Sequence, residues 1–375
     1  MNNFDRSIVA TGSSYGAIAD DKHAQLAVEK ALRNIEACTI GSVLLFLSGG
    51  YAHKPQSAIK AAAKAASTPL VFGCCAMGLL TEDEWLLDVE GAVAMVFPNN
   101  LALQALTVLE QQGIKPEQVL TLSTPNAVTM AVNSTDTPQI GAIATDEYGH
   151  GPFSVWQSGR IIEREFMQAA FATPIKSTTH VAEGVRALSP IMPISDVDGH
   201  CLLKLDQSDT PNAVTNLLSH LPENLHNIGL NQPYNILCAI SENDQRESIS
   251  NGHYKLHHVV SINQSDEQIF LSGSAKENHY LFWAIRDEQY AQELMHNQLL
   301  SAKSKLGDSA KFAFMFPNIS RGPDFFNGQD RDLELFKEIF PNTPLIGFYG
   351  NGEIAPGHRY SGLIHRYSTV FSIFA

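Results

Sequence analysis

The chain has 375 residues, long enough for two or three ordinary domains or one large one. Its hydrophobic fraction of 44% and charged fraction of 17% are typical of a globular protein with a sizeable core. The net charge of −14, without any basic stripe, excludes general binding to nucleic acid or to anionic membranes, because neutralising phosphates requires clustered Lys and Arg.

The N-terminus has no apolar stretch of signal-peptide length, and no run reaches the roughly 18 apolar residues of a membrane span. We therefore expect a cytoplasmic location and no membrane insertion. The five cysteines fit a reducing compartment, because their number is odd and none has C-x-x-C spacing. Adjacent Cys74 and Cys75 are most simply two small buried residues, with a reactive or ligand-binding thiol as the alternative.

The first third of the chain alternates helical and strand patterns, which predicts an α/β layer. The expected elements are a helix at 24–36, a buried strand in 41–51, a helix at 55–66, strands in 69–78 and 91–98, and a helix at 101–113 closed by Gly113.

The rest of the chain predicts hairpins, a boundary and a second α/β part. Hairpins are expected around Ser158-Gly159 and in 196–206, followed by a helix that begins near Thr210-Pro211. Residues 222–235 are rich in Pro and Asn and have no periodicity, which predicts a domain boundary near 230. The elements beyond it are strands at 234–241, 254–262 and 268–273, a long helix at 287–306, a strand at 311–317, a helix at 331–340, and strands at 344–350 and 367–374. The fold class is therefore α/β, with two related modules, 1–230 and 231–375, packed into one compact unit.

Three similar words occur along the sequence: "TPLVFGCCAMG" (68–78), "TPQIGAIATDEYG" (137–149) and "TPLIGFYGNGE" (343–353). Each has Thr-Pro, an apolar entry and an early glycine. They predict one repeated unit, in which Pro ends a helix and a short buried strand leads into a glycine-bearing loop. Three short matches also fit chance, so duplication stays a hypothesis at this point.

The common catalytic and nucleotide-binding motifs are missing. The spacing G-x-x-G-x-G at 347–352 is neither the P-loop nor the dinucleotide pattern, and no G-x-S-x-G elbow is present. Cys74 has no sequence-local histidine partner, and the histidines form no H-E-x-x-H or H-x-H motif. A haem iron needs a single axial histidine in an apolar pocket, so spacing cannot exclude a ligand such as His365.

Glu353 is the carboxylate most suggestive of a site, because glycines enclose it and an apolar segment follows. A buried carboxylate needs a cation or several N–H donors. Arg321 lies in another strand-end loop and is the predicted partner, with a purely structural ion pair as the alternative. The carboxylates at Asp146-Glu147 and 82–84 are more simply interpreted as solvated loops.

The quoted words carry a resemblance to the FIST (F-box and intracellular signal transduction) family. The C-terminal part, "FPNISRG", "TPLIGFYGNGEIAPG" and "GLIHRYSTVFSIF", is similar to the family's C-terminal module, with "GF…GEI.P" as its most specific word. "VLLFLSGGY", "PLVFGCCAMGLL", "GAVAMVF" and "IGAIATDEYG" resemble the N-terminal module. Pro317-Asn318 stand where a cysteine is common, Cys75 replaces a usual hydroxyl, and Tyr367 replaces a second histidine.

The resemblance implies a stand-alone bacterial sensor of small ligands, with amino acids as the proposed class. It would signal through a partner such as a histidine kinase or a cyclic-di-GMP enzyme. One alternative is the haem-binding nitric oxide sensors of the family, with His365 as iron ligand. A second is a hydrolase using Cys74 or Glu353, and a third is a purely structural interaction module. We expect no catalytic residues and no metal site other than that haem iron.

The predicted ligand-binding residues come from both halves of the chain: Arg321, Glu353, Asn351, His365, Cys74 and Asp146. Arg321 would hold an anionic group such as a carboxylate through bidentate hydrogen bonds. Glu353 would accept from an ammonium group or orient Arg321. The pocket is expected between the two halves, at strand ends.

Overall fold

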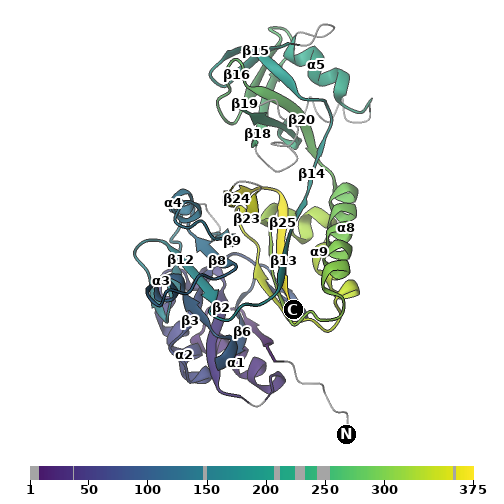
Figure 1. Cartoon of the computed structure of the whole chain (residues 1–375). Coiled ribbons are helices and arrows are strands. Elements are labelled where there is room, and N and C mark those ends of the chain that lie inside the picture. The colour runs from purple at the N-terminus through teal and green to yellow at the C-terminus, as the bar shows by residue number, and fades with distance from the viewer. Residues whose placement is uncertain are drawn as a thin grey trace. The chain divides into compact units, whose positions relative to one another are not determined.

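The computed structural model describes residues 8–36, 38–146, 150–206, 212–223, 233–242, 254–357 and 360–375. The chain forms two compact units: unit 1 consists of Met1–Glu183 and Gln292–Ala375, and unit 2 of Gly184–Ala291. Helices combine with mixed sheets, which confirms the α/β class (Figure 1). The module boundary predicted near residue 230 lies outside the described residues and stays a prediction.

Unit 1 is built from three successive segments of the same design, here named repeats A, B and C. Repeat A contains β1 (Ala10–Gly16), α1 (Asp21–Asn34), β2 (Ile40–Leu47), α2 (Gln56–Ala66), β3 (Val71–Cys75), the hairpin β4 (Leu79–Thr81) and β5 (Trp85–Leu86), and β6 (Glu90–Pro98). Repeat B contains β7 (Leu103–Ala105), α3 (Leu106–Gln111), β8 (Val119–Ser123), α4 (Val128–Val132), β9 (Gln139–Ile143), the hairpin β10 (Val155–Gln157) and β11 (Arg160–Ile161), and β12 (Phe166–Phe171).

Repeat C follows the same order but is interrupted by unit 2. It contains β13 (Ser177–Glu183), α8 (Glu288–Leu306), β21 (Phe312–Pro317), α9 (Arg331–Ile339), β22 (Leu345–Phe348), the hairpin β23 (Glu353–Gly357) and β24 (Tyr360–His365), and β25 (Ser368–Phe374). Short 3-10 turns join these elements: η1 (Gly49–Tyr51), η2 (Asn99–Leu101), η4 (Ile319–Arg321) and η5 (Pro323–Phe326).

The register of the three parallel strand pairs confirms the repeat predicted from the Thr-Pro words. In each repeat the second strand of the pair, β3, β9 or β22, carries the glycine of its word. The register places Gly73 opposite Leu45, Gly141 opposite Thr121 and Gly347 opposite Met315. A Cβ at any of these glycines would lie 1.6 to 1.7 Å from the carbonyl oxygen of the opposite residue. The glycine in each word is therefore required by close strand approach.

The hairpins are exchanged between repeats in a closed cycle. The sheet orders are β1-β6-β2-β3-β10-β11, β7-β12-β8-β9-β23-β24 and β13-β25-β21-β22-β4-β5. Each sheet thus ends in the hairpin of another repeat: A receives that of B, B that of C, and C that of A. At the third junction Glu82 accepts from the Leu345 N–H (3.0 Å) and from the Thr11 hydroxyl. The prediction that 82–84 is simply a solvated loop is wrong for Glu82.

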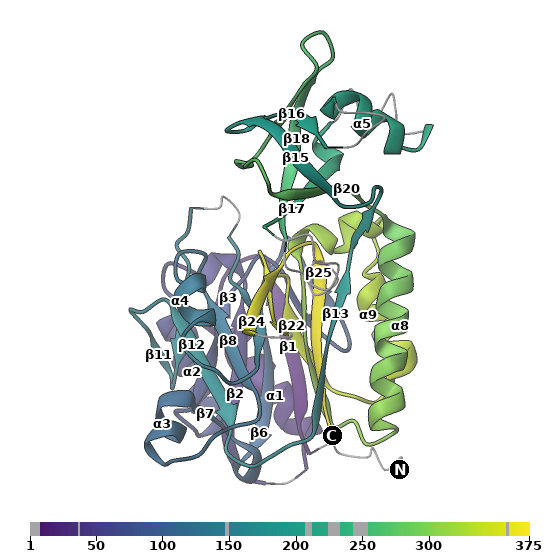
Figure 2. The same ribbon diagram turned by 45° about the horizontal axis from the view of Figure 1, so that its top comes forward.

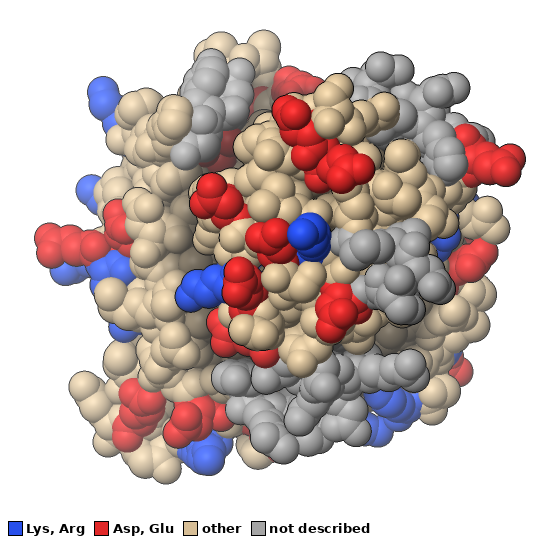
Figure 3. All heavy atoms as spheres, turned by 90° about the horizontal axis from the view of Figure 1, so that it is seen from above, with Lys and Arg blue, Asp and Glu red and all other residues tan. Residues whose placement is uncertain are grey.

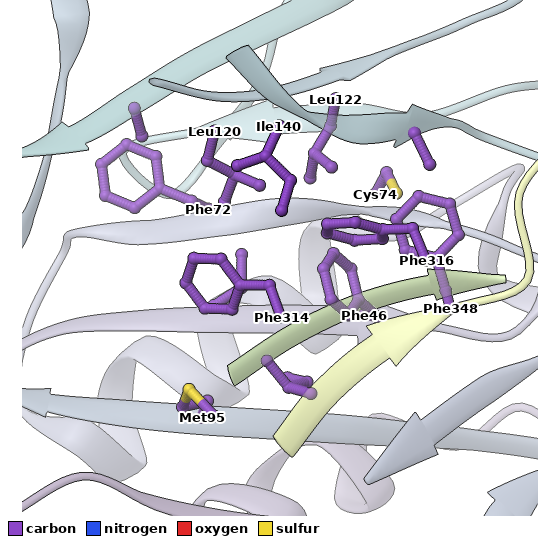
Figure 4. Close-up of a cluster of buried hydrophobic side chains, with 14 of the residues drawn as sticks. Phe46, Phe72, Cys74, Met95, Leu120, Leu122, Ile140, Phe314, Phe316 and Phe348 are labelled. Carbon is purple, nitrogen blue, oxygen red and sulfur yellow. The ribbon is translucent and has the colours of Figure 1, made fainter. Parts of the chain in front are cut away.

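The inner faces of the three sheets share one hydrophobic core, which contains residues of every repeat (Figure 4). Strand β2 shows how the sequence produces this packing. Leu44 and Phe46 point into the shared core, whereas Val43, Leu45 and Leu47 pack under α1 and α2. Both faces of the strand are buried, which explains its unbroken apolar run. Helices α8 and α9 cover the outer face of the third sheet in the same way (Figure 2).

Unit 2 is an antiparallel barrel with one described α-helix. Its elements are β14 (Val185–Ala187), β15 (Met192–Asp198), β16 (Cys201–Leu205), α5 (Ala213–His220), η3 (Pro233–Asn235), β17 (Ile236–Ser241), β18 (Lys255–Asn263), β19 (Gln268–Leu271) and β20 (Tyr280–Arg286). Pairing runs β15-β16-β19-β18-β17-β20 and returns to β15, which closes the ring. Trp283 fills the core, and its indole N–H donates to Asn216 of α5 (2.8 Å).

Most described elements agree with the sequence predictions. The hairpin at Ser158-Gly159 has positive φ at both residues (51° and 76°), as a tight two-residue turn requires. Helix α5 begins at Ala213 with Asn212 as its N-cap; the predicted start at 210–211 lies outside the described residues. The helix predicted for 101–113 begins only at Leu106, because Leu103–Ala105 pairs with β12 as a strand.

Candidate functional site

A pocket of about 260 Å³ opens in unit 1 at the carboxyl ends of the parallel strands β2 and β3. We call it the acidic pocket. Its lining residues are Ser48, Gly49, Gly50, Ala52, His53, Met77, Asp88, Val89, Glu90, Asp146, Gly151 and Pro152. Strand ends of this kind are where α/β folds commonly bind ligands, because loops diverge there and leave space above the sheet.

One wall is the turn that follows β2. The Ser48 hydroxyl donates to Glu90 Oε2 and accepts from the Gly91 N–H (2.9 Å), while the Gly50 N–H donates to the same carboxylate oxygen (3.1 Å). A Cβ at position 50 would lie 2.4 Å from the Glu90 carboxylate, so glycine there lets the carboxylate approach the backbone closely. At Gly49 a Cβ would meet nothing within 4 Å. The turn thus fixes Glu90 and leaves space beside Gly49.

A second wall belongs to repeat B and includes Asp146, just after β9. Asp146 Oδ2 accepts from the N–H groups of His150 (3.0 Å) and Gly151 (2.7 Å). This wall is tied to the loops after β3 and β22: the Met77 N–H donates to Thr145 Oγ1 (2.9 Å), and that hydroxyl donates to the Tyr349 carbonyl (3.0 Å). Loops from all three repeats therefore hold the pocket's shape.

The pocket is negative. Asp88, Glu90 and Asp146 line it, together with His53, and the lining contains no Lys or Arg. Asp146 Oδ1 and Glu90 Oε1 have no hydrogen-bond donor among the residues that the structure describes. Two half-buried carboxylates with available oxygens favour a cationic group such as an ammonium. Within the described ranges, no group of three or more His, Cys, Asp or Glu is placed to hold a metal ion.

Of the six predicted site residues, Asp146 alone lines the acidic pocket. Cys74 is fully buried in the shared core, and burial raises the pKa of its thiol well above the ordinary value. Neighbouring Cys75 points to the other side of β3, under the helices. The simpler interpretation of the pair, as two small buried residues, is therefore correct, and Cys74 does not reach the pocket.

The predicted ion pair between Arg321 and Glu353 is wrong. Arg321 is 2% exposed, and its Nε and Nη2 donate to the two oxygens of Asp332 (2.7 and 3.0 Å). Its Nη1 donates to the Ala182 carbonyl (2.9 Å), and Asp332 also accepts from the Thr369 hydroxyl (2.5 Å). Arg321 ends η4 and Asp332 lies in the first turn of α9, so the pair joins these two elements. The guanidinium forms a buried ion pair with Asp332. This agrees with the alternative of a purely structural ion pair, although the partner differs.

Glu353 is fully buried and is held by neutral donors. Its carboxylate accepts from Asn318 Nδ2 (2.9 Å), the Ser368 hydroxyl (2.9 Å) and the Gly352 N–H (3.2 Å). Burial raises its pKa to about 8, and these hydrogen bonds only partly oppose the shift. His365 lies directly opposite Glu353 in the β23–β24 register, so these two predicted residues do meet. Asn351 is exposed in the loop before β23.

The raised pKa of Glu353 predicts a specific pH dependence of stability. In the folded protein the carboxyl binds a proton up to about pH 8, whereas in the unfolded chain it loses the proton near pH 4.5. The contribution of this carboxyl to the free energy of unfolding is fully present below pH 4.5 and is lost as the pH rises towards 8. Relative to wild type, Glu353→Gln is therefore expected to gain stability from pH 5 to pH 8, by on the order of 3 kcal/mol. Chemical denaturation at both pH values measures the stability difference between Glu353→Gln and wild type. A difference that is the same at pH 5 and pH 8 would contradict the burial argument.

The haem alternative, with His365 as the iron ligand, stays a prediction. His365 belongs to β24 and pairs with Glu353 in the β23–β24 register. Neither the acidic pocket nor the larger pocket described below, both formed by described residues, includes His365. His358, the other histidine near this strand, lies outside the described residues. No step of the proposal below therefore depends on haem.

Sequence reasoning missed Ser48, Gly49 and Glu90, which line the pocket. "SGG" at 48–50 lies at the end of the buried strand expected in 41–51, and a polar residue with two glycines after such a strand is also typical of a binding loop. Glu90, directly before a buried strand, had no sequence signal that connected it with Ser48. The two meet because β6 pairs with β2 in antiparallel register.

Comparison with known proteins agrees with this architecture and with the resemblance found in the sequence. The model of the FIST N domain matches residues 42–208, and that of the FIST C domain matches 213–356. The chain is also similar to F-box only protein 22 of Homo sapiens and of Pongo abelii, with 28% identity over 104 residues in each case. These matches cover 24% of the chain and 25% of each relative, so the chain spans about a quarter of the length of these proteins.

FIST domains are sensor domains of signal transduction. In the part of the chain that the structure describes, no helix has the length and apolar character to span a membrane. The two family matches together cover most of the chain, in the order N domain then C domain, and the three exchanged hairpins join them within unit 1. The chain belongs to the FIST family and carries its N and C domains in one polypeptide.

Proposed function

We propose that this protein senses a small ligand with a cationic head group, bound in the acidic pocket, and signals through a partner protein. The observation that carries the proposal is the pair of carboxylate oxygens, Asp146 Oδ1 and Glu90 Oε1, on two residues that line the same strand-end pocket. An ammonium group bound in the pocket would donate hydrogen bonds to these oxygens. Amino acids and small amines have this group and suit a pocket of about 260 Å³.

The fold supports ligand sensing because the two walls come from different repeats. Glu90 belongs to repeat A and Asp146 to repeat B, so a bound cation would bridge two segments whose contact depends on the exchanged hairpin β10–β11. A ligand that bridges them stabilises one arrangement of the loops over others. A partner protein would recognise the loop arrangement that the ligand stabilises. The partner class, a histidine kinase or a cyclic-di-GMP enzyme, rests on the family resemblance.

The alternatives receive less support from the described residues. A hydrolase that uses Cys74 would need an accessible thiolate, whereas this thiol is fully buried and its pKa is raised. Glu353 is equally buried, and its carboxylate is satisfied by three donors. Neither group is placed to meet a substrate in this conformation.

Removing the charge at Asp146 tests the proposal. We expect Asp146→Asn to weaken binding of the cationic ligand by about tenfold or more, because a charge-assisted hydrogen bond is lost. Glu90→Gln should weaken it too, whereas the exposed Glu163→Gln is a matched control that leaves it unchanged. Isothermal titration against a panel of amino acids and small amines provides the measurement. Equal affinities in Asp146→Asn and Glu163→Gln would reject this site.

A further inference from the structure

A second pocket, of about 380 Å³, lies at the other end of unit 1. We call it the basal pocket. Its lining residues are Ile8, Glu36, Cys38, Pro98, Asn100, Leu101, Thr173, Pro174, Ile175, Lys176, Lys311 and Ala375. Strand β6 runs from Glu90 in the acidic pocket to Pro98 in the basal pocket, a distance of roughly 27 Å along an extended strand. The two pockets are therefore separate sites.

The basal pocket has the opposite charge preference. Lys176 and Lys311 line it, in a chain whose net charge is −14 and whose surface shows many acidic side chains (Figure 3). Hydrogen bonds to the end of β25 fix the backbone of both lysines: the Lys311 N–H donates to the Phe374 carbonyl (2.7 Å), and the Lys176 carbonyl accepts from the Ala375 N–H (2.8 Å).

The two ammonium groups differ in their present partners. Lys176 Nζ donates to the Lys305 carbonyl (3.1 Å), whereas Lys311 Nζ has no partner among the residues that the structure describes. Glu36 is the acidic side chain of the lining and opposes them. The Lys311 ammonium is thus available to an anion. The negative charge of Glu36 weakens the attraction between the pocket and that anion.

Part of the lining is aliphatic. Pro98, Leu101, Pro174 and Ile175 form an aliphatic surface. The strands that lead to the pocket end in phenylalanines at equivalent positions of the three repeats. Phe97 and Phe171 have ring centroids 5.5 Å apart, and Phe171 and Phe374 are 5.8 Å apart. These packed rings close the core at this end, so the lining rests on a rigid base.

We propose that the basal pocket binds a small organic anion with an aliphatic body, such as a monocarboxylate. The carboxylate would pair with Lys311, with Lys176 close by, and the alkyl part would cover Leu101 and Ile175. The volume falls within the range of small-molecule sites, which combine apolar surface with a few placed polar or charged groups. This site goes beyond the proposed sensor function, because it involves neither Asp146 nor Glu90.

Cys38 provides a direct reporter of occupancy. It lines the pocket and is exposed, whereas Cys74, Cys75 and Cys238 are buried and Cys201 is half-buried. In full-length protein carrying Cys201→Ser, iodoacetamide should therefore modify Cys38 first. Octanoate is expected to slow this alkylation, measured by intact mass spectrometry, and octylamine of the same chain length is not.

Charge variants then identify the recognised group. Lys311→Met should weaken protection by octanoate about threefold, and Glu36→Gln should strengthen it by a similar factor. Lys115→Met, a surface lysine outside the pocket, is the matched control and should behave like wild type, as should Asp146→Asn. The proposal is overturned if octanoate gives no protection, if octylamine protects equally, or if Lys311→Met and Lys115→Met give the same apparent affinity.

Discussion

Replacing Gly347 with alanine is expected to lower the free energy of unfolding by about 3–5 kcal/mol and the melting temperature by roughly 10 °C. The added Cβ would lie 1.6 Å from the Met315 carbonyl oxygen, in the middle of a strand pair that is buried on both faces. Neither strand can move away without separating the sheet from the shared core. The loss therefore exceeds that of an ordinary strand substitution.

The same loss should appear at the two equivalent glycines. Gly73 and Gly141 have φ of +152° and +157°, and a Cβ at either would lie 1.7 Å from the opposite carbonyl oxygen. Gly49→Ala is the control, because a Cβ there meets nothing within 4 Å, and it should change stability by less than about 0.5 kcal/mol. Thermal melts of the four variants measure these effects. If the three strand variants have the same melting temperature as Gly49→Ala, the three-repeat register is wrong.

Asp332→Asn should be the other strongly destabilising change, at about 3–5 kcal/mol, because it leaves the buried Arg321 guanidinium without its anion. Asp332 also accepts from the Thr369 hydroxyl, so the loss affects β25 as well as α9. Replacing both partners, as in Arg321→Met with Asp332→Leu, should cost less than Asp332→Asn alone, since the buried guanidinium and its partner carboxylate are removed together.

An exposed ion pair of the same helix provides the comparison. Arg331 and Glu334 are one-third to two-fifths exposed, and Glu334→Gln should cost less than about 1 kcal/mol. Denaturant titrations of these variants give the values. A cost of Asp332→Asn no larger than that of Glu334→Gln would show that Arg321 is not committed to a structural pair. The ligand-binding role predicted for Arg321 from the sequence would then regain support.

The glycine words show which part of the fold a sequence can reveal. Thr-Pro followed by a short apolar run and a glycine is a local pattern, because all of its residues lie within one strand and the turn beside it. The repeated unit could therefore be predicted from 68–78, 137–149 and 343–353. The hairpin exchange could not, because it depends on which sheet each hairpin joins, and Leu80 of repeat A meets Gly347 of repeat C far along the chain.

The site was harder to predict for the same physical reason. Arg321 was assigned to Glu353 because both follow strands in glycine-bearing loops, yet the first turn of α9 brings Asp332 to the guanidinium instead. Glu90 and Asp146 face one pocket only because β6 pairs with β2 and because the loop after β9 leads to a hairpin that joins the sheet of repeat A. Topology, rather than any local pattern, assembles the acidic pocket.

This view also changes the meaning of the family's most specific words. In "GFYGNGE" the first glycine allows the close approach of β22 to β21, and Glu353 is a buried carboxyl held by Asn318 and Ser368. These residues build the fold beside the pocket. The residues that we expect to contact the ligand, Glu90 and Asp146, lie at the junction of repeats A and B.

Native mass spectrometry of the purified protein, with its visible spectrum recorded in parallel, tests the ligand site most directly. We expect a small amino acid or amine, added in excess, to appear as a bound adduct on wild-type protein and on Glu163→Gln and to be strongly reduced on Asp146→Asn, without any Soret band. An adduct retained in full by Asp146→Asn, or a Soret band lost in His365→Ala, would contradict the assignment of the acidic pocket as the sensing site.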